Sequence, residues 1–221
     1  MRIRILALLS AVLSAVVSIS AAAQEFSAGV VTTKPNSEGA VAAGRVLVAD
    51  GKVRLELPEF PGGFFLIDPP ADIAYFVNPI RRVFMEARQS SRLASVLVAL
   101  DPDAPCEQWQ AIARITGLGN PNHPWRCARL GTELVDTRET IRYQAVAPDA
   151  SSYDVWIDPK MRFPVRVRVE VGVVTDIKDI DEKPQPKEAF EIPAGYSKFD
   201  PQGLIDRIKQ SDVWVEQPEA R

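Results

Sequence analysis

Alternation of apolar and charged residues with a period of two is the feature that most constrains how this chain folds. The clearest case is the segment 163–171, in which Val165 and Val167 alternate with Arg166 and Arg168. Because successive side chains of a strand point to opposite faces of a sheet, this pattern predicts a strand with one buried and one solvated face. Antiparallel sheets commonly have one face of each kind, so the pattern favours an antiparallel architecture.

Turn residues divide much of the remaining chain into short segments of the same kind. Asp50-Gly51 is a favoured pair for a type I′ turn, whose two central residues both need a positive φ, and it predicts a hairpin between strands 44–48 and 52–57. In the segment 81–86 apolar residues occur at both odd and even positions, so the pattern does not show which face of this strand is buried. Further strands are predicted over 26–33, 64–68, 73–78, 81–86, 128–135, 140–146, 153–157, 162–171 and 174–180.

Three other segments have helical periodicity instead. Residues 92–100, 106–115 and 201–209 carry apolar residues three or four positions apart, which predicts amphipathic helices. The order is therefore strands, two helices, strands and a final helix, without the strand–helix alternation of parallel sheets. We expect an α+β, mainly β fold: one curved antiparallel sheet with two middle helices and a C-terminal helix, the helices packed on one face.

The N-terminus has the order of a cleaved secretory signal. Two arginines precede an apolar run over 5–19, and small residues follow up to Ala23, as at signal-peptidase sites. A membrane anchor is the rival interpretation, but the run is shorter than the roughly 20 apolar residues of a spanning helix. We expect removal of residues 1–23, a single domain over 24–221, a periplasmic location and no transmembrane anchor after cleavage.

Charge and cysteine content narrow the class of function. Loss of Arg2 and Arg4 with the signal changes the formal net charge from −3 to −5, because all 29 acidic residues remain; nucleic acid is therefore not an expected partner. A lone cysteine pair in an exported chain usually forms a disulfide, which we expect between Cys106 and Cys127. A metal pair or a redox pair is less favoured, because the chain has one histidine, no third thiol and no Cys-x-x-Cys spacing.

Catalytic, metal and nucleotide motifs are absent from the sequence. There is no G-x-S-x-G, H-E-x-x-H, P-loop or G-x-G-x-x-G, and His123 lies in a predicted exposed loop. The acidic groups at 101–103 and 176–182 lack the spacing of a calcium loop. Four aspartates precede proline, and turn initiation explains them better than paired carboxylates do: Asp68, Asp101, Asp158 and Asp200. We expect no enzymatic activity, no metal and no cofactor.

Several short motifs together resemble a known group of proteins. They are the Asp-Gly-Lys-Val-Arg segment 50–54, Asn78-Pro79, the Trp-Ile-Asp-Pro-Lys segment 156–160 and the Phe-Glu-Ile-Pro-Ala-Gly-Tyr segment 190–196. This series is similar to bacterial periplasmic proteins of the LolA/LolB-like superfamily, and more closely to an uncharacterised envelope family within it. The resemblance implies an incomplete, strongly curved β-barrel with helices closing its concave side. Relatives carry lipoprotein acyl chains or sense envelope stress by binding lipids and proteins.

The resemblance implies a binding protein for a lipid or other apolar ligand, held in the half-barrel under a helical lid. Burial of acyl methylenes, at about 0.8 kcal/mol each, would drive binding. Lipoprotein carriage itself is not implied, since that carrier begins with an amphipathic helix and this chain with a strand. The alternative is a protein-interaction or envelope-stress-sensing module with a packed core and an envelope protein as partner. The expected ligand-lining residues are Val53, Leu55, Phe65, Tyr75, Leu93, Leu97, Trp109, Val165 and Val167.

Overall fold

A single open sheet dominates the computed structural model, which describes residues 25–36, 39, 41–87, 91–120, 122–169 and 171–210. The predicted signal peptide lies outside these residues. The described part forms twelve strands in the order β12-β6-β5-β4-β3-β2-β1-β11-β10-β9-β8-β7, antiparallel except for the parallel pair β12 and β6. The strands are β1 (Phe26–Thr33), β2 (Val41–Ala49), β3 (Lys52–Glu56), β4 (Phe64–Asp68), β5 (Ile73–Asn78), β6 (Val83–Glu86), β7 (Arg126–Val135), β8 (Arg138–Val146), β9 (Ser152–Asp158), β10 (Phe163–Val169), β11 (Val174–Asp181) and β12 (Ser197–Lys198).

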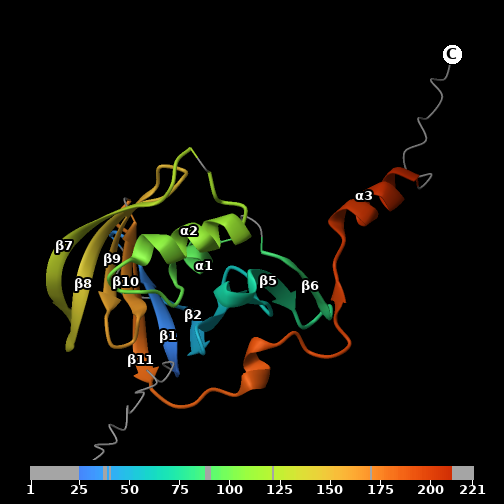
Figure 1. The fold of residues 1–221 in the computed structure, drawn as a ribbon. Coiled ribbons are helices and arrows are strands. Elements are labelled where there is room, and N and C mark those ends of the chain that lie inside the picture. Colours follow the sequence, from blue (N-terminus) through green and yellow to red (C-terminus); the bar gives the residue numbers. More distant parts are fainter. Residues whose placement is uncertain are drawn as a thin grey trace, which may run out of the picture.

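Two of the three α-helices cover the concave face of the sheet (Figure 1). They are α1 (Arg92–Val96) and α2 (Pro105–Ile115), and we refer to them together as the lid. The third helix, α3 (Pro201–Gln210), has no buried residue and stands clear of the sheet. The expectation that the helices share one face is therefore confirmed for the lid and wrong for α3. Helix α3 lies apart from the lid because it follows β12, the strand at the far edge of the sheet.

Local backbone geometry explains where the elements begin and end. The β2–β3 hairpin has positive φ at Asp50 (51°) and Gly51 (77°), as the type I′ prediction requires. The first helix ends at Val96 rather than at residue 100, because Leu97 leaves the helical region with a ψ of 72°. Strand β6 starts at Val83 rather than at residue 81, because Arg82 adopts a φ of 52° in the preceding turn.

Among the residues that the structure describes, the buried apolar side chains form two separate clusters. The larger one fills the space between the concave face and the lid. The smaller one lies on the convex face of β4 and β5, where Phe64, Leu66 and Val77 are buried. It is covered by the segment 182–196, which includes the short 3-10 helix η2 (Lys187–Phe190) and which we call the strap. The sheet is thus buried on both faces at β4–β5, a feature that strand alternation alone did not predict.

Candidate functional site

Eight of the nine predicted ligand-lining residues belong to the cluster under the lid. Seven are buried there, with 0–2% of their surface exposed, and Leu93 packs against them partly buried. Side chains this inaccessible to water leave no ligand-sized space between them under the lid. The interior of the half-barrel is therefore occupied by the side chains that were expected to line it. The seven are Val53, Leu55, Phe65, Leu97, Trp109, Val165 and Val167. Val53 also borders a pocket of about 210 Å³, which lies beside Tyr75 and Ile192 of the strap.

Tyr75 does not join this group. It lies on the convex face, where its ring centroid is 5.2 Å from that of Phe84 and where it packs against the smaller cluster under the strap. The opposite alternation of β5 turns Ala74 and Phe76 toward the concave side instead. Apolar residues occur at both odd and even positions of this strand, so its sequence pattern does not show which side chains point toward the concave face.

Aromatic rings fill the lid end of the interior. Trp109 lies with its ring centroid 5.4 Å from that of Trp125, which lies 5.8 Å from Tyr153. The Trp109 Nε1 donates a hydrogen bond of 3.1 Å to the Val96 carbonyl, which ties α2 to α1. A crevice of about 30 Å³ lies beside Trp125 and Tyr153. That volume suits one or two water molecules and is far too small for an acyl chain.

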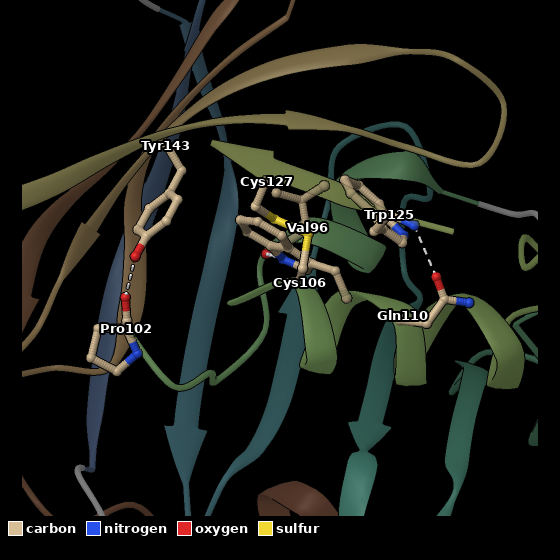
Figure 2. The surroundings of a disulfide bond; sticks show 8 residues. Val96, Pro102, Cys106, Gln110, Trp125, Cys127 and Tyr143 are labelled. Atoms are coloured by element: carbon tan, nitrogen blue, oxygen red, sulfur yellow. Dashed lines mark hydrogen bonds between the residues drawn. A yellow bond between two sulfur atoms is a disulfide. The ribbon is translucent and has the colours of Figure 1, made fainter. Parts of the chain in front are cut away.

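Covalent and polar contacts fasten the lid to the sheet (Figure 2). Cys106 of α2 and Cys127 of β7 form a disulfide with their Cα atoms 5.9 Å apart, as predicted. The Tyr143 hydroxyl donates to the Pro102 carbonyl at 2.9 Å, and the Trp125 backbone N–H donates to Gln110 Oε1 at 2.9 Å. Burial raises the pKa of the Tyr143 phenol. These two hydrogen bonds could not be predicted from the sequence, because their partners are 15 and 41 residues apart in the chain.

An ion pair closes the outer side of the lid. The Arg92 guanidinium of α1 lies 3.0 Å from a carboxylate oxygen of Asp149, in the turn between β8 and β9. Both side chains are exposed, so the pair adds little stability in water. The Leu100 N–H also donates to the Arg162 carbonyl at 2.9 Å. The lid is therefore held along its length rather than at one hinge.

Strand β7 is an exposed edge of the sheet. It is the last strand in the described part of the sheet and pairs with β8 alone. Leu130 and Leu134 are 51% and 73% exposed on it. A register shift between Arg129 and Gly131 marks a β-bulge, which bends the strand in its middle. One long side of β7 thus presents backbone groups and apolar side chains to solvent.

A cluster of paired charges surrounds Trp156 on the convex face. Its Nε1 donates to Glu133 Oε2 at 2.7 Å, and the Arg142 guanidinium lies 5.1 Å from the ring centroid. The hydrogen bond from Trp156, followed by that from Arg142, holds the pKa of Glu133 below its ordinary value. Arg168 pairs with Asp154 across the same surface. Each of these charges has an opposite partner, so the cluster stabilises the sheet rather than presenting a reactive group.

The acidic residues that precede proline act as turn caps, as predicted. Each accepts a backbone N–H two or three residues ahead: Asp68 from Ala71 at 3.3 Å, Asp101 from Asp103 at 3.0 Å, Asp158 from Lys160 at 2.8 Å and Asp200 from Gly203 at 3.0 Å. His123 is exposed. Across the described ranges, no three His, Cys, Asp or Glu side chains are grouped so that they could hold a metal ion. Nor does any helix described there combine the length and apolar character of a bilayer span.

Comparisons with known proteins identify similar folds and no family. No family model matches the chain, and no curated protein matches it. Among solved structures it is similar to PNGF-II, at 8% identity over 85% of this chain and 33% of that chain, with a TM-score of 0.50. It is also similar to an uncharacterized conserved protein from Thermus thermophilus, at 10% identity over 81% of this chain and 91% of that chain, with a TM-score of 0.45.

A third match is the LolA superfamily protein NE2245 from Nitrosomonas europaea. The identity is 13%, over 76% of this chain and 90% of that chain, with a TM-score of 0.35. This chain spans about a third of PNGF-II and most of the other two proteins. Members of the superfamily that the sequence motifs resemble are thus among the structural matches, and the likeness concerns the fold alone.

Proposed function

We propose that this chain is an exported, non-catalytic binding protein of the cell envelope that recognises an extended polypeptide at strand β7. The observation that carries the proposal is the contrast between a filled interior and an open sheet edge. An edge strand presents a row of backbone donors and acceptors, and an extended polypeptide satisfies such a row by adding a strand. The disulfide at Cys127 supports this role, because it anchors the start of β7 to the lid.

The side chains of β7 indicate what kind of polypeptide fits. Leu130 and Leu134 offer exposed apolar contacts, and Arg126 and Arg129 are exposed cations near the start of the strand. The bulge interrupts the strand at Leu130, so residues 131–135 are the regular part that a partner strand can pair with. We therefore expect a partner segment with apolar residues opposite Leu134 and acidic residues toward Arg126.

Binding of a lipid or acyl chain in the interior is the competing proposal. The predicted lining residues other than Tyr75 lie together in one cluster, so the interior has the apolar composition that a lipid site needs. A ligand would nevertheless have to displace the lid, break the Trp109 hydrogen bond and expose side chains that are 0–2% exposed in the structure. The polypeptide proposal needs no such rearrangement, and we favour it for that reason.

Native mass spectrometry separates the two proposals. We expect the mature chain, purified from an envelope fraction, to carry a polypeptide, and hydrogen exchange to show added protection at residues 131–135. Leu130→Lys with Leu134→Lys should abolish the complex. Val171→Lys is the matched control, because Val171 is 74% exposed away from β7. Bare protein, or a bound lipid with added protection at the lid (α1 and α2) instead of at residues 131–135, would contradict the proposal.

A further inference from the structure

Helix α3 exposes an apolar stripe. Leu204, Ile205 and Ile208 are 39%, 44% and 44% exposed, and none of the ten residues of the helix is buried. The Phe199 N–H donates to the Phe84 carbonyl at 2.7 Å, and Asp200 Oδ1 caps the first turn. These contacts fix the point at which the chain leaves the sheet, and Figure 1 shows the helix projecting away from it.

Charges are arranged around the stripe in a defined order. At roughly 100° per residue, the three apolar side chains occupy an arc of about 100°. Arg207 and Lys209 lie at its two margins, whereas Asp206 lies on the far side, where Gln202 donates to it at 2.9 Å. Cations in the last turn also suit the helix dipole, but the dipole does not dictate their position around the axis. The face that carries the stripe is therefore apolar with a cationic margin on each side.

We propose that α3 docks on an anionic lipid surface, with the stripe entering the interface and Arg207 and Lys209 contacting phosphate oxygens of the headgroups. An apolar helix face with basic margins is the arrangement that interfacial helices use. The expected mature chain, without Arg2 and Arg4, has a formal net charge of −5, so an anionic surface would repel most of the molecule. Local charge complementarity therefore points to this helix as the contact, independently of the polypeptide site proposed at β7.

A second copy of the chain is the other occupant to consider. A groove of about 460 Å³ is lined by Asp72, Ile73, Tyr75, Glu86, Arg114 and Ile115 among others. Its two carboxylates suit a cationic helix, but Arg114 would face the same cations. A phosphate-bearing surface has no such opposing charge, and we favour the lipid for that reason.

Vesicle cosedimentation of the mature chain tests the proposal. We expect binding to phosphatidylcholine vesicles that contain phosphatidylglycerol, little binding to phosphatidylcholine alone, and weaker binding as salt is raised. Ile205→Glu with Ile208→Glu should lower the partition coefficient by at least about tenfold. Arg207→Gln with Lys209→Gln should lower it about thirtyfold, following the usual contribution of a basic residue near an anionic membrane.

Arg81→Gln with Arg82→Gln is the matched control, because it removes two exposed cations beside Ile80, which is 80% exposed. Binding should be unchanged in this variant. Loss of binding in it alone would place the contact at the β5–β6 turn and overturn the proposal. Absence of vesicle binding, or self-association in sedimentation velocity that the α3 variants abolish, would also overturn it. Since no residue of α3 is buried and Arg81 and Arg82 are exposed, the thermal unfolding midpoints of all variants should match that of the wild type.

Discussion

Replacing Trp109 with alanine tests whether the interior beneath the lid is a packed core. The side chain is 0% exposed, its Nε1 donates to the Val96 carbonyl at 3.1 Å, and its ring lies 5.4 Å from that of Trp125. It therefore contributes packing, a hydrogen bond between α1 and α2, and an aromatic contact at the same time. If the lid were loosely held over an unfilled hollow, none of these contributions would be large.

The magnitude follows from these contacts. Truncating a buried tryptophan to alanine costs about 3–5 kcal/mol of unfolding free energy. Leaving a buried carbonyl without its donor costs about 1–3 kcal/mol, and the aromatic pair contributes about 0.5–1.5 kcal/mol. The three effects overlap, and the disulfide between Cys106 and Cys127 limits how far the lid can collapse into the space. We therefore expect a total loss of about 5 kcal/mol, at the upper end of the usual range.

Urea unfolding followed by circular dichroism measures the loss. A loss of that size is comparable to the whole stability of many domains, at about 5–15 kcal/mol. Trp109→Phe is therefore the companion variant, with an expected loss of about 2 kcal/mol from the missing hydrogen bond and the smaller ring. A loss below about 1 kcal/mol in the alanine variant would refute the packed interior. It would instead favour a lid that opens for a ligand.

Three further predictions concern the disulfide, a close backbone contact and a titrating carboxylate. Replacing Cys106 and Cys127 with alanine should lower the unfolding free energy by about 3 kcal/mol in urea titrations, because the closed loop spans a sequence separation of 21. Gly44→Ala should cost about 2 kcal/mol or more, because its Cβ would lie 1.8 Å from a backbone oxygen of β3; Gly29→Ala, at 3.7 Å from its neighbour, should be near neutral. Glu133 has a lowered pKa, so its stabilisation is complete above its ordinary value of 4.5 and is lost as the pH falls through the folded value. Glu133→Gln should therefore flatten the acid limb of the stability–pH curve measured by thermal unfolding, and more so at low salt.

Much of the secondary structure was determined by the sequence alone. Strands β1, β4 and β5 have the predicted bounds, and Asp50 and Gly51 of the hairpin turn both have the predicted positive φ. These features depend on side-chain alternation and on turn geometry, which neighbouring residues set among themselves. The disulfide was predictable for another reason, because the chain offers one possible cysteine pair. The turn caps formed by aspartates before proline were also predictable, because each aspartate accepts a backbone N–H only two or three residues later.

The tertiary structure alone decided which apolar surfaces are covered. In β5 both alternations are apolar, and Tyr75 lies on the convex face because the strap, more than a hundred residues later in the chain, buries that side. The same long-range packing placed Trp109 inside the half-barrel and left the stripe of α3 exposed. A sequence pattern marks which residues avoid water. It does not say whether the surface that covers them belongs to the same chain, and that question decides between a core, a ligand site and a docking face.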